Sequence, residues 1–215
     1  MKIQKNLKIF LFIFLSSIGL QAQNEKTKDT ITEKNLDEAL LHPNDVIRLD
    51  LSNQKINFET LDLSTFINLE YLNLENDHFK EFPKGLNNLK KLKTLNLSGN
   101  DFTNLPSNFI ELTSLEELFL NNEIKFKLEN NLVTLSKLPA LHSLHLENDK
   151  LKKIPAEISL LKKLKYLNLN KNKLKEFPLG IQALQKLQYL DLKDNFIKQE
   201  DIDLLPLNFG FQINL

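Results

Sequence analysis

Residues 92–102 read LKTLNLSGNDF, and this stretch decides the fold because it returns along the chain at a fixed interval. Clear further copies are LKYLNLNKNKL at 164–174 and LQYLDLKDNFI at 187–197. The copies begin at Val46, Leu69, Leu92, Leu115, Leu141, Leu164 and Leu187. Five of the steps are 23 residues and one is 26, so the chain is a tandem array of one structural unit.

The spacing inside one unit predicts its local structure. We number positions from the first residue of each copy, so that Leu95 and Leu97 are positions 4 and 6 of the copy that begins at Leu92. Positions 4 and 6 alternate as in a strand, so Leu95 and Leu97 point to one face, and the residues at positions 3, 5 and 7 point to the other. A proline then ends ladder pairing in four units. Apolar residues three apart follow, such as Ile158 and Leu161, as a helical turn needs. The four prolines are Pro83, Pro106, Pro155 and Pro178. One unit cannot bury its own leucines, but stacked units can.

This pattern resembles the leucine-rich-repeat family in its 23-residue form with a Leu-Pro step, similar to Ras-suppressor-type and exported bacterial repeat proteins. The resemblance covers residues 46–215. It implies an α/β fold: a right-handed solenoid with a concave parallel sheet and short helices or turns on the convex side. It also implies a ladder of asparagines at position 9, which Asn100, Asn172 and Asn195 match.

Departures from the family pattern concentrate at position 9 and in the fourth repeat. Gln54, Asp77, Glu123 and Asp149 replace the ladder asparagine. An ionised carboxylate only accepts hydrogen bonds, so we expect the ladder to be interrupted there. The fourth repeat has three extra residues, and its segment EIKFKLENNLVTLSKL predicts a longer convex helix.

The two ends of the array predict the domain boundaries. Residues 1–22 read as a cleaved signal peptide, with a lysine-bearing start and the apolar run IFLFIFLSSIGL, and cleavage is expected before Gln23. Residues 23–45 are expected to form a tail and a capping helix that Thr32 begins and Pro43 ends. Seven repeats then occupy 46–209, and residues 210–215 supply a capping strand. The protein is therefore expected outside the cytoplasm, in the periplasm or extracellular, with no transmembrane segment in the mature chain.

The sequence does not favour a catalytic function. The chain has no cysteine, and it lacks GxSxG, HExxH and a glycine-rich phosphate loop. His142 and His145 are three apart on a predicted strand and tend toward opposite faces. Asp77 and Asp149 lie three repeats apart and cannot share an ion. We therefore expect no catalytic residues, no metal site, no cofactor and no enzyme.

A binding surface is expected on the concave face, where position 3 holds all three tyrosines of the protein. Aromatic residues are favoured interface anchors because they bury much area with few rotatable bonds. The predicted contact set is Tyr71, Glu117, Phe119, His145, Glu147, Tyr166 and Tyr189. The alternative for Tyr166 and Tyr189 is that neighbouring rings simply pack across the sheet.

Charge marks a second surface. Residues 150–175 hold nine lysines and one acid, Glu157. The predicted loop edge after strands five and six carries Lys150, Lys152, Lys153, Lys171, Lys173 and Lys175. It is either a solvated face or a site for an acidic glycan, a lipid headgroup or an acidic protein. Nucleic acid is not expected, because residues 23–215 hold 25 basic and 28 acidic residues.

The sequence thus predicts an exported module that binds a protein or peptide on its concave sheet. Two alternatives stay open. The chain is a structural or self-assembling component of the cell envelope, or it binds acidic glycan or lipid headgroups through the lysine-rich edge.

Overall fold

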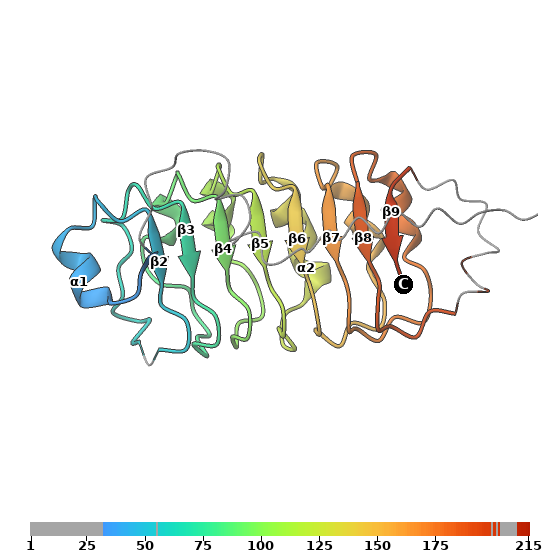
Figure 1. Ribbon diagram of the computed structural model, residues 1–215, viewed down its shortest axis with the longest axis horizontal. Helices are drawn as coiled ribbons and strands as arrows, with labels where there is room; N and C mark the ends of the chain where they lie inside the picture. Colours follow the sequence, from blue (N-terminus) through green and yellow to red (C-terminus); the bar gives the residue numbers. More distant parts are fainter. Residues whose placement is uncertain (1–31, 55, 199, 201, 203–209) are drawn as a thin grey trace, which may run out of the picture. The chain divides into compact units, whose positions relative to one another are not determined.

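A computed structural model describes residues 32–54, 56–198, 200, 202 and 210–215. Its strands form one parallel sheet in chain order (Figure 1). The strands are β1 Thr32–Glu33, β2 Arg48–Asp50, β3 Tyr71–Asn73, β4 Thr94–Asn96, β5 Glu117–Phe119, β6 Ser143–His145, β7 Tyr166–Asn168, β8 Tyr189–Asp191 and β9 Gln212–Asn214. This is the expected repeat solenoid with a parallel sheet along one side.

The register of the sheet follows the repeat. Leu72, Leu95 and Leu118 are aligned across β3, β4 and β5, and each is fully buried. The alignment continues through Leu144 and Leu167 into β8. Each strand from β2 to β8 therefore points its central leucine inward, which confirms the parity predicted from the 23-residue spacing.

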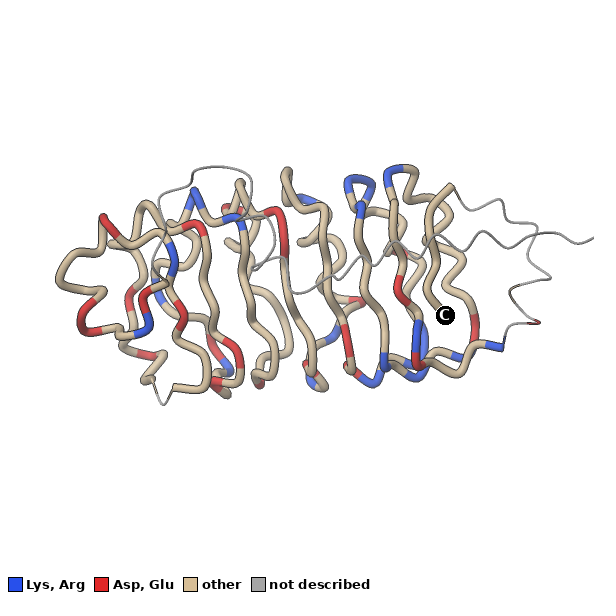
Figure 2. Tube along the Cα trace, in the orientation of Figure 1, with Lys and Arg blue, Asp and Glu red and all other residues tan. Residues whose placement is uncertain are grey.

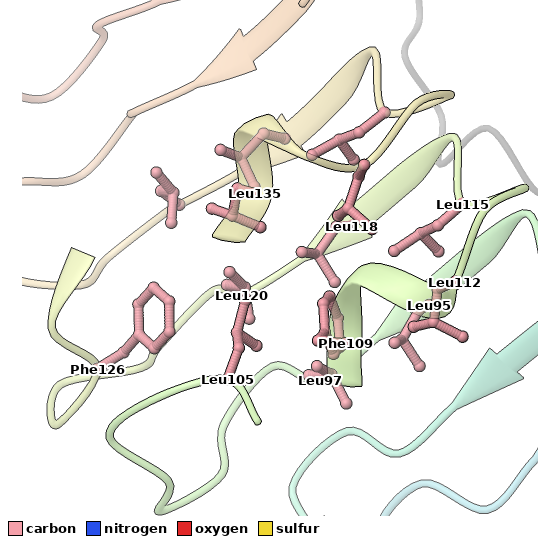
Figure 3. Packing of buried hydrophobic residues seen from close by; sticks show 14 of the residues in the cluster. Leu95, Leu97, Leu105, Phe109, Leu112, Leu115, Leu118, Leu120, Phe126 and Leu135 are labelled. Carbon is pink, nitrogen blue, oxygen red and sulfur yellow. The ribbon is translucent and has the colours of Figure 1, made fainter. Parts of the chain in front are cut away.

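Short helices form the convex layer behind the strands (Figure 1). They are the 3₁₀-helices η2 Leu86–Asn88, η3 Ser107–Glu111, η4 Ala156–Leu160 and η5 Leu179–Ala183, and the α-helix α2 Leu128–Ser136. The three extra residues of the fourth repeat thus lie in the unit that forms the nine-residue helix α2. Leu118 from β5 and Leu135 from α2 point into the same apolar interior (Figure 3).

A row of phenylalanines fills the interior beneath the turns of the first repeats. Phe79 and Phe102 stack with ring centroids 5.5 Å apart, and Phe58 and Phe126 extend the row at either end. In the later repeats Leu151 and Leu174 take the place of these rings. The sequence pattern treats Phe79, Phe102, Leu151 and Leu174 as one apolar position and does not reveal the aromatic contacts, and Phe126 and Phe58 lie one and two residues later in their repeats.

The N-terminal end differs from the prediction. Thr32 does not cap the helix; it lies in β1, which pairs with β2, and its Oγ1 accepts a hydrogen bond from Arg48 Nε at 3.2 Å. The helix α1 is Leu36–Leu41, and Asn35 caps it by accepting from the backbone N–H of Asp37. Asparagine is as good an N-cap as threonine, so Thr32 is free to extend the sheet.

Position 9 of the repeats forms a continuous chain of acceptors, contrary to the expected interruption. Asp149 Oδ1 accepts the backbone N–H of Glu123 at 2.7 Å, and Asn172 Oδ1 accepts that of Asp149 at 3.0 Å. Glu123 Oε1 in turn accepts the N–H of Asn100. Accepting needs only an oxygen, which Asp, Glu and Asn all supply. What the acidic residues lack is the amide donor, because Asn172 Nδ2 also donates to the Leu146 carbonyl at 2.7 Å.

Burial changes the protonation of these carboxyls. Glu123 is 1 % exposed, and burial raises its pKa to about 8. Burial likewise raises the pKa of Asp149 to about 8 and that of Asp77 to about 6. Glu123 Oε2 is buried without a hydrogen-bond partner. A carboxyl in this setting favours its protonated form, because desolvation penalises the charge.

In the part of the chain that the structure describes, no helix is both long and apolar enough to cross a membrane. The predicted signal peptide at 1–22 and the tail up to residue 31 lie outside the described residues.

Candidate binding face

Positions 3 and 5 of each repeat flank the buried leucine of a strand and point away from the core. On β7 and β8 these flanking side chains are half-buried while the leucine between them is fully buried. The same alternation holds on β2 and β4. The concave face therefore presents a regular grid of side chains whose spacing is set by the strands.

The middle of this grid holds a compact cluster on β5 and β6. The rings of Phe119 and His145 stack with centroids 4.0 Å apart and planes 12° apart. His145 Nε2 lies 3.0 Å from Glu117 Oε1 and 3.0 Å from Ser143 Oγ. Only 12 % of the His145 and Glu117 side chains is exposed, so their interaction is largely screened from water. Glu117 fixes the imidazole, and the imidazole supports the Phe119 ring.

The cluster contains a serine, a histidine and a carboxylate, but its geometry is not that of a hydrolytic triad. A triad needs the serine on one imidazole nitrogen and the carboxylate on the other. Here Ser143 Oγ and Glu117 Oε1 both contact Nε2 of His145, and they lie 3.3 Å from each other. The arrangement orients side chains and does not prepare a nucleophile.

Tyr71 was expected to offer its ring for contact, and the structure contradicts that expectation. The Tyr71 side chain is 5 % exposed, and the guanidinium of Arg48 lies 4.1 Å from its ring centroid. Burial raises the pKa of the Tyr71 hydroxyl to about 12. Arg48 is held over the ring by Thr32 of the extra strand β1, which the repeat pattern did not predict. Glu117 is also buried and supports the face from below.

Tyr166 and Tyr189 lie side by side on β7 and β8, where they are register partners. Both side chains are half-buried. The Tyr189 hydroxyl donates to Asp191 Oδ2 at 3.4 Å, and burial raises its pKa. Together with Phe119 and His145, the two tyrosines place an aromatic residue on each of four successive strands, β5 to β8.

Glu147 joins the concave face to the lysine-rich edge. Its Oε1 lies 2.6 Å from Lys171 Nζ, and this ion pair raises the pKa of Lys171. The other lysines of the edge are exposed and have no ion pair within the described residues. They are Lys150, Lys152, Lys153, Lys173 and Lys175. Figure 2 shows basic residues gathered on the turns that follow the last strands.

The two histidines of the β6 region take different partners. His142 Nε2 lies 3.6 Å from Glu116 Oε2, whereas His145 contacts Glu117. In the described ranges, no three His, Cys, Asp or Glu side chains form a group that could hold a metal ion.

Ser143 is the member of the concave cluster that the sequence analysis missed. Aligning position 3 of neighbouring repeats places it beside Glu117 and would have revealed the contact.

Two family models match the chain. One, described as a leucine-rich repeat region, matches residues 41–136, and a second, described as a leucine rich repeat, matches residues 139–197. Comparison with curated protein sequences finds no match.

Solved structures show the same fold. A leucine-rich-repeat protein of Leptospira interrogans is 28 % identical, with a TM-score of 0.61 over 85 % of this chain and 54 % of that one. This chain therefore spans about half the length of that protein. The Toll–Spatzle complex of Drosophila gives 17 % identity and a TM-score of 0.64 over 75 % of this chain and 22 % of that one. A TLR13–ssRNA13 complex gives 24 % identity and a TM-score of 0.66 over 85 % of this chain and 29 % of that one.

Proposed function

The chain belongs to the leucine-rich-repeat family, and from that premise we propose that it is a binding module whose concave sheet takes a protein or peptide partner. The observation that carries the proposal is the aromatic patch on β5 to β8, formed by Phe119, His145, Tyr166 and Tyr189. These residues lie on strands of the sheet and are half-buried, with 12 % of the His145 side chain exposed. Aromatic anchors on a preorganised surface lose little entropy on binding.

The dimensions of the sheet suit a polypeptide. Nine strands spaced about 4.8 Å apart give a face roughly 38 Å long, enough for an interface of modest size. The hydrogen bonds of Glu117 and Ser143 to His145 support the ring pair from beneath. A partner can therefore bury Phe119 without first ordering it.

The charge of the concave face favours a polypeptide over a nucleic acid. Positions 3, 5 and 7 of the repeats carry Arg48 and Lys193 as their basic residues. The acidic residues at these positions are Asp50, Glu75, Glu117, Glu147 and Asp191. Such a face repels phosphates, whose neutralisation by Lys and Arg drives nucleic-acid binding. Toll and TLR13 are each solved in a complex, with Spatzle and with ssRNA13, so the fold alone does not choose the partner class.

The test is capture of a partner from envelope or secreted extract, followed by affinity measurement on variants. We expect Phe119→Ser to weaken binding by about 2 kcal/mol or more, roughly 30-fold, as loss of a central aromatic anchor does. Thr94→Ser on β4 is the matched control on the same face, away from the patch, and should bind normally. A captured partner that binds Phe119→Ser and wild type equally would refute the concave site.

We also propose that the module acts outside the cytoplasm, after removal of residues 1–22. The support is the lysine-bearing start followed by an apolar run of 12 residues, too short to span a bilayer. We expect N-terminal sequencing of the exported protein to begin at or near Gln23. Recovery of Met1 from a cytosolic fraction would contradict export.

A further inference from the structure

The turns that follow β6 and β7 carry more positive charge than the other turns of the repeats. Residues 148–153 and 171–176 together hold six lysines and two acids. The equivalent residues 53–58, 76–81, 99–104 and 122–127 hold four lysines and four acids. We call these two turns, together with residues 194–198 of the turn that follows β8, the basic turn edge. Its charge is local, because the preceding repeats have the same backbone and no such excess.

Backbone hydrogen bonds place the basic turns side by side. The Lys173 N–H donates to the Leu151 carbonyl at 2.8 Å, and the Phe196 N–H donates to the Leu174 carbonyl at 2.8 Å. Lys173 therefore lies beside the turn that carries Lys150 and Lys152, and Phe196 lies beside Lys173 and Lys175. Figure 2 shows basic residues along this edge, and others on the opposite edge of the same repeats.

Exposed apolar side chains occupy both ends of this row. Phe196 is 63 % exposed, at the same repeat position as Lys173 and Lys150. Ile124, at that position one repeat before Lys150, is 59 % exposed. Its turn is joined to the next by the hydrogen bond from Asn148 Nδ2 to Asn122 Oδ1 at 2.7 Å. Cations flanked by exposed apolar groups match an anionic surface with an apolar layer beneath it.

The backbone at Lys150 has a left-handed conformation. Its φ is +58°, in the left-handed region that costs energy for a side chain other than glycine or asparagine. Within the described part of the chain Lys150 has no ion pair that would offset this strain. His78, at the same position of its repeat, also has a positive φ, so this conformation belongs to the turn and does not require a lysine.

We propose that the basic turn edge docks the protein on a membrane surface rich in anionic lipid, with the lysines facing the headgroups and Phe196 entering the interface. The alternative of an acidic polysaccharide explains the lysines but gives Phe196 and Ile124 no role. The edge is separate from the aromatic patch of the concave face, so a protein docked in this way keeps its sheet available to a partner.

The test is co-sedimentation with vesicles, using the chain from Gln23 onward so that the apolar run at 9–20 is absent. Residues 31–215 form one compact unit, which this form retains. We expect binding to vesicles of phosphatidylglycerol and phosphatidylcholine, little binding to phosphatidylcholine alone, and loss at high salt. Lys152→Glu with Lys173→Glu should lower partitioning on the order of twentyfold, and Phe196→Ser several-fold.

Two further variants make the outcome specific. Lys150→Asn removes a charge and relieves the left-handed strain, so it should bind vesicles less while unfolding at the same or a higher temperature. Lys162→Glu with Lys163→Glu changes as much charge on the opposite edge, before β7, and should retain binding. Equal loss in that control would show only a general charge effect and overturn the proposal. Lysine-dependent binding to heparin without binding to vesicles would assign the edge to a polysaccharide and also overturn it.

Discussion

Leu167→Ala is expected to lower the free energy of unfolding by about 2–5 kcal/mol, as large-to-small changes in a packed core do. Leu167 lies at the centre of β7, is fully buried, and is aligned with Leu144 and Leu190 on the neighbouring strands. Replacing its isobutyl group with a methyl group leaves a cavity that the stacked repeats on either side cannot fill without shifting. Denaturant unfolding followed by circular dichroism measures the loss.

Tyr166→Ser is the matched control, since Tyr166 is the preceding residue on the same strand and faces the opposite way. It should change the free energy of unfolding by no more than about 1 kcal/mol, because little core is lost. A loss of unfolding free energy below about 0.5 kcal/mol for Leu167→Ala, or above about 1 kcal/mol for Tyr166→Ser, would mean that the inward and outward faces are assigned wrongly.

The double variant Glu123→Gln, Asp149→Asn is expected to remove a large pH dependence of stability. Burial raises the folded-state pKa of both carboxyls to about 8. In the unfolded chain they ionise near pH 4. Between these values the unfolded state releases protons that the folded state holds, so the stability present below about pH 4 is lost as the pH rises toward 8. The slope is on the order of 1.4 kcal/mol per pH unit for each group.

The amide variants should therefore be more stable than wild type at pH 8, while at pH 5 the difference should be much smaller. Each amide oxygen can still accept the backbone N–H of the preceding repeat, and its nitrogen gains the donor role that Asn172 already plays. Unfolding midpoints at pH 5 and pH 8 measure the change. Glu176→Gln, which removes an exposed carboxyl of the turn edge, is the control for the change in net charge. A wild-type profile that matches the double variant would show that both carboxyls are ionised in the folded protein.

The repeat period predicted most of the fold because one physical constraint recurs in every unit. Leucines at fixed spacing must face inward, so strand positions, register and the sheet follow from the steps of 23 and 26 residues. The N-terminal end was harder to predict, because Thr32 and Asn35 are both acceptable helix caps. Only the pairing of β1 with β2 decides between them.

The candidate face was predicted in outline but not in its contacts. Parity placed Phe119, His145, Tyr166 and Tyr189 on the concave side. It could not predict that Arg48 covers Tyr71 or that Ser143 joins the cluster, since both depend on side-chain conformations between neighbouring strands. The acceptor chain at position 9 was likewise missed. The family pattern emphasises the asparagine donor, whereas the backbone N–H groups require only an oxygen.

The central claim, that the concave sheet is the binding face, is tested most directly by nitrating the three tyrosines with and without the captured partner. In the free protein Tyr166 and Tyr189 should react, while the buried Tyr71, whose pKa is raised to about 12, should react far less and serves as an internal control. Bound partner should protect Tyr166 and Tyr189, as mapped by mass spectrometry. Unchanged nitration of both tyrosines in the complex, together with protection of Lys152 and Lys173 from acetylation, would contradict the account and place the partner on the turn edge.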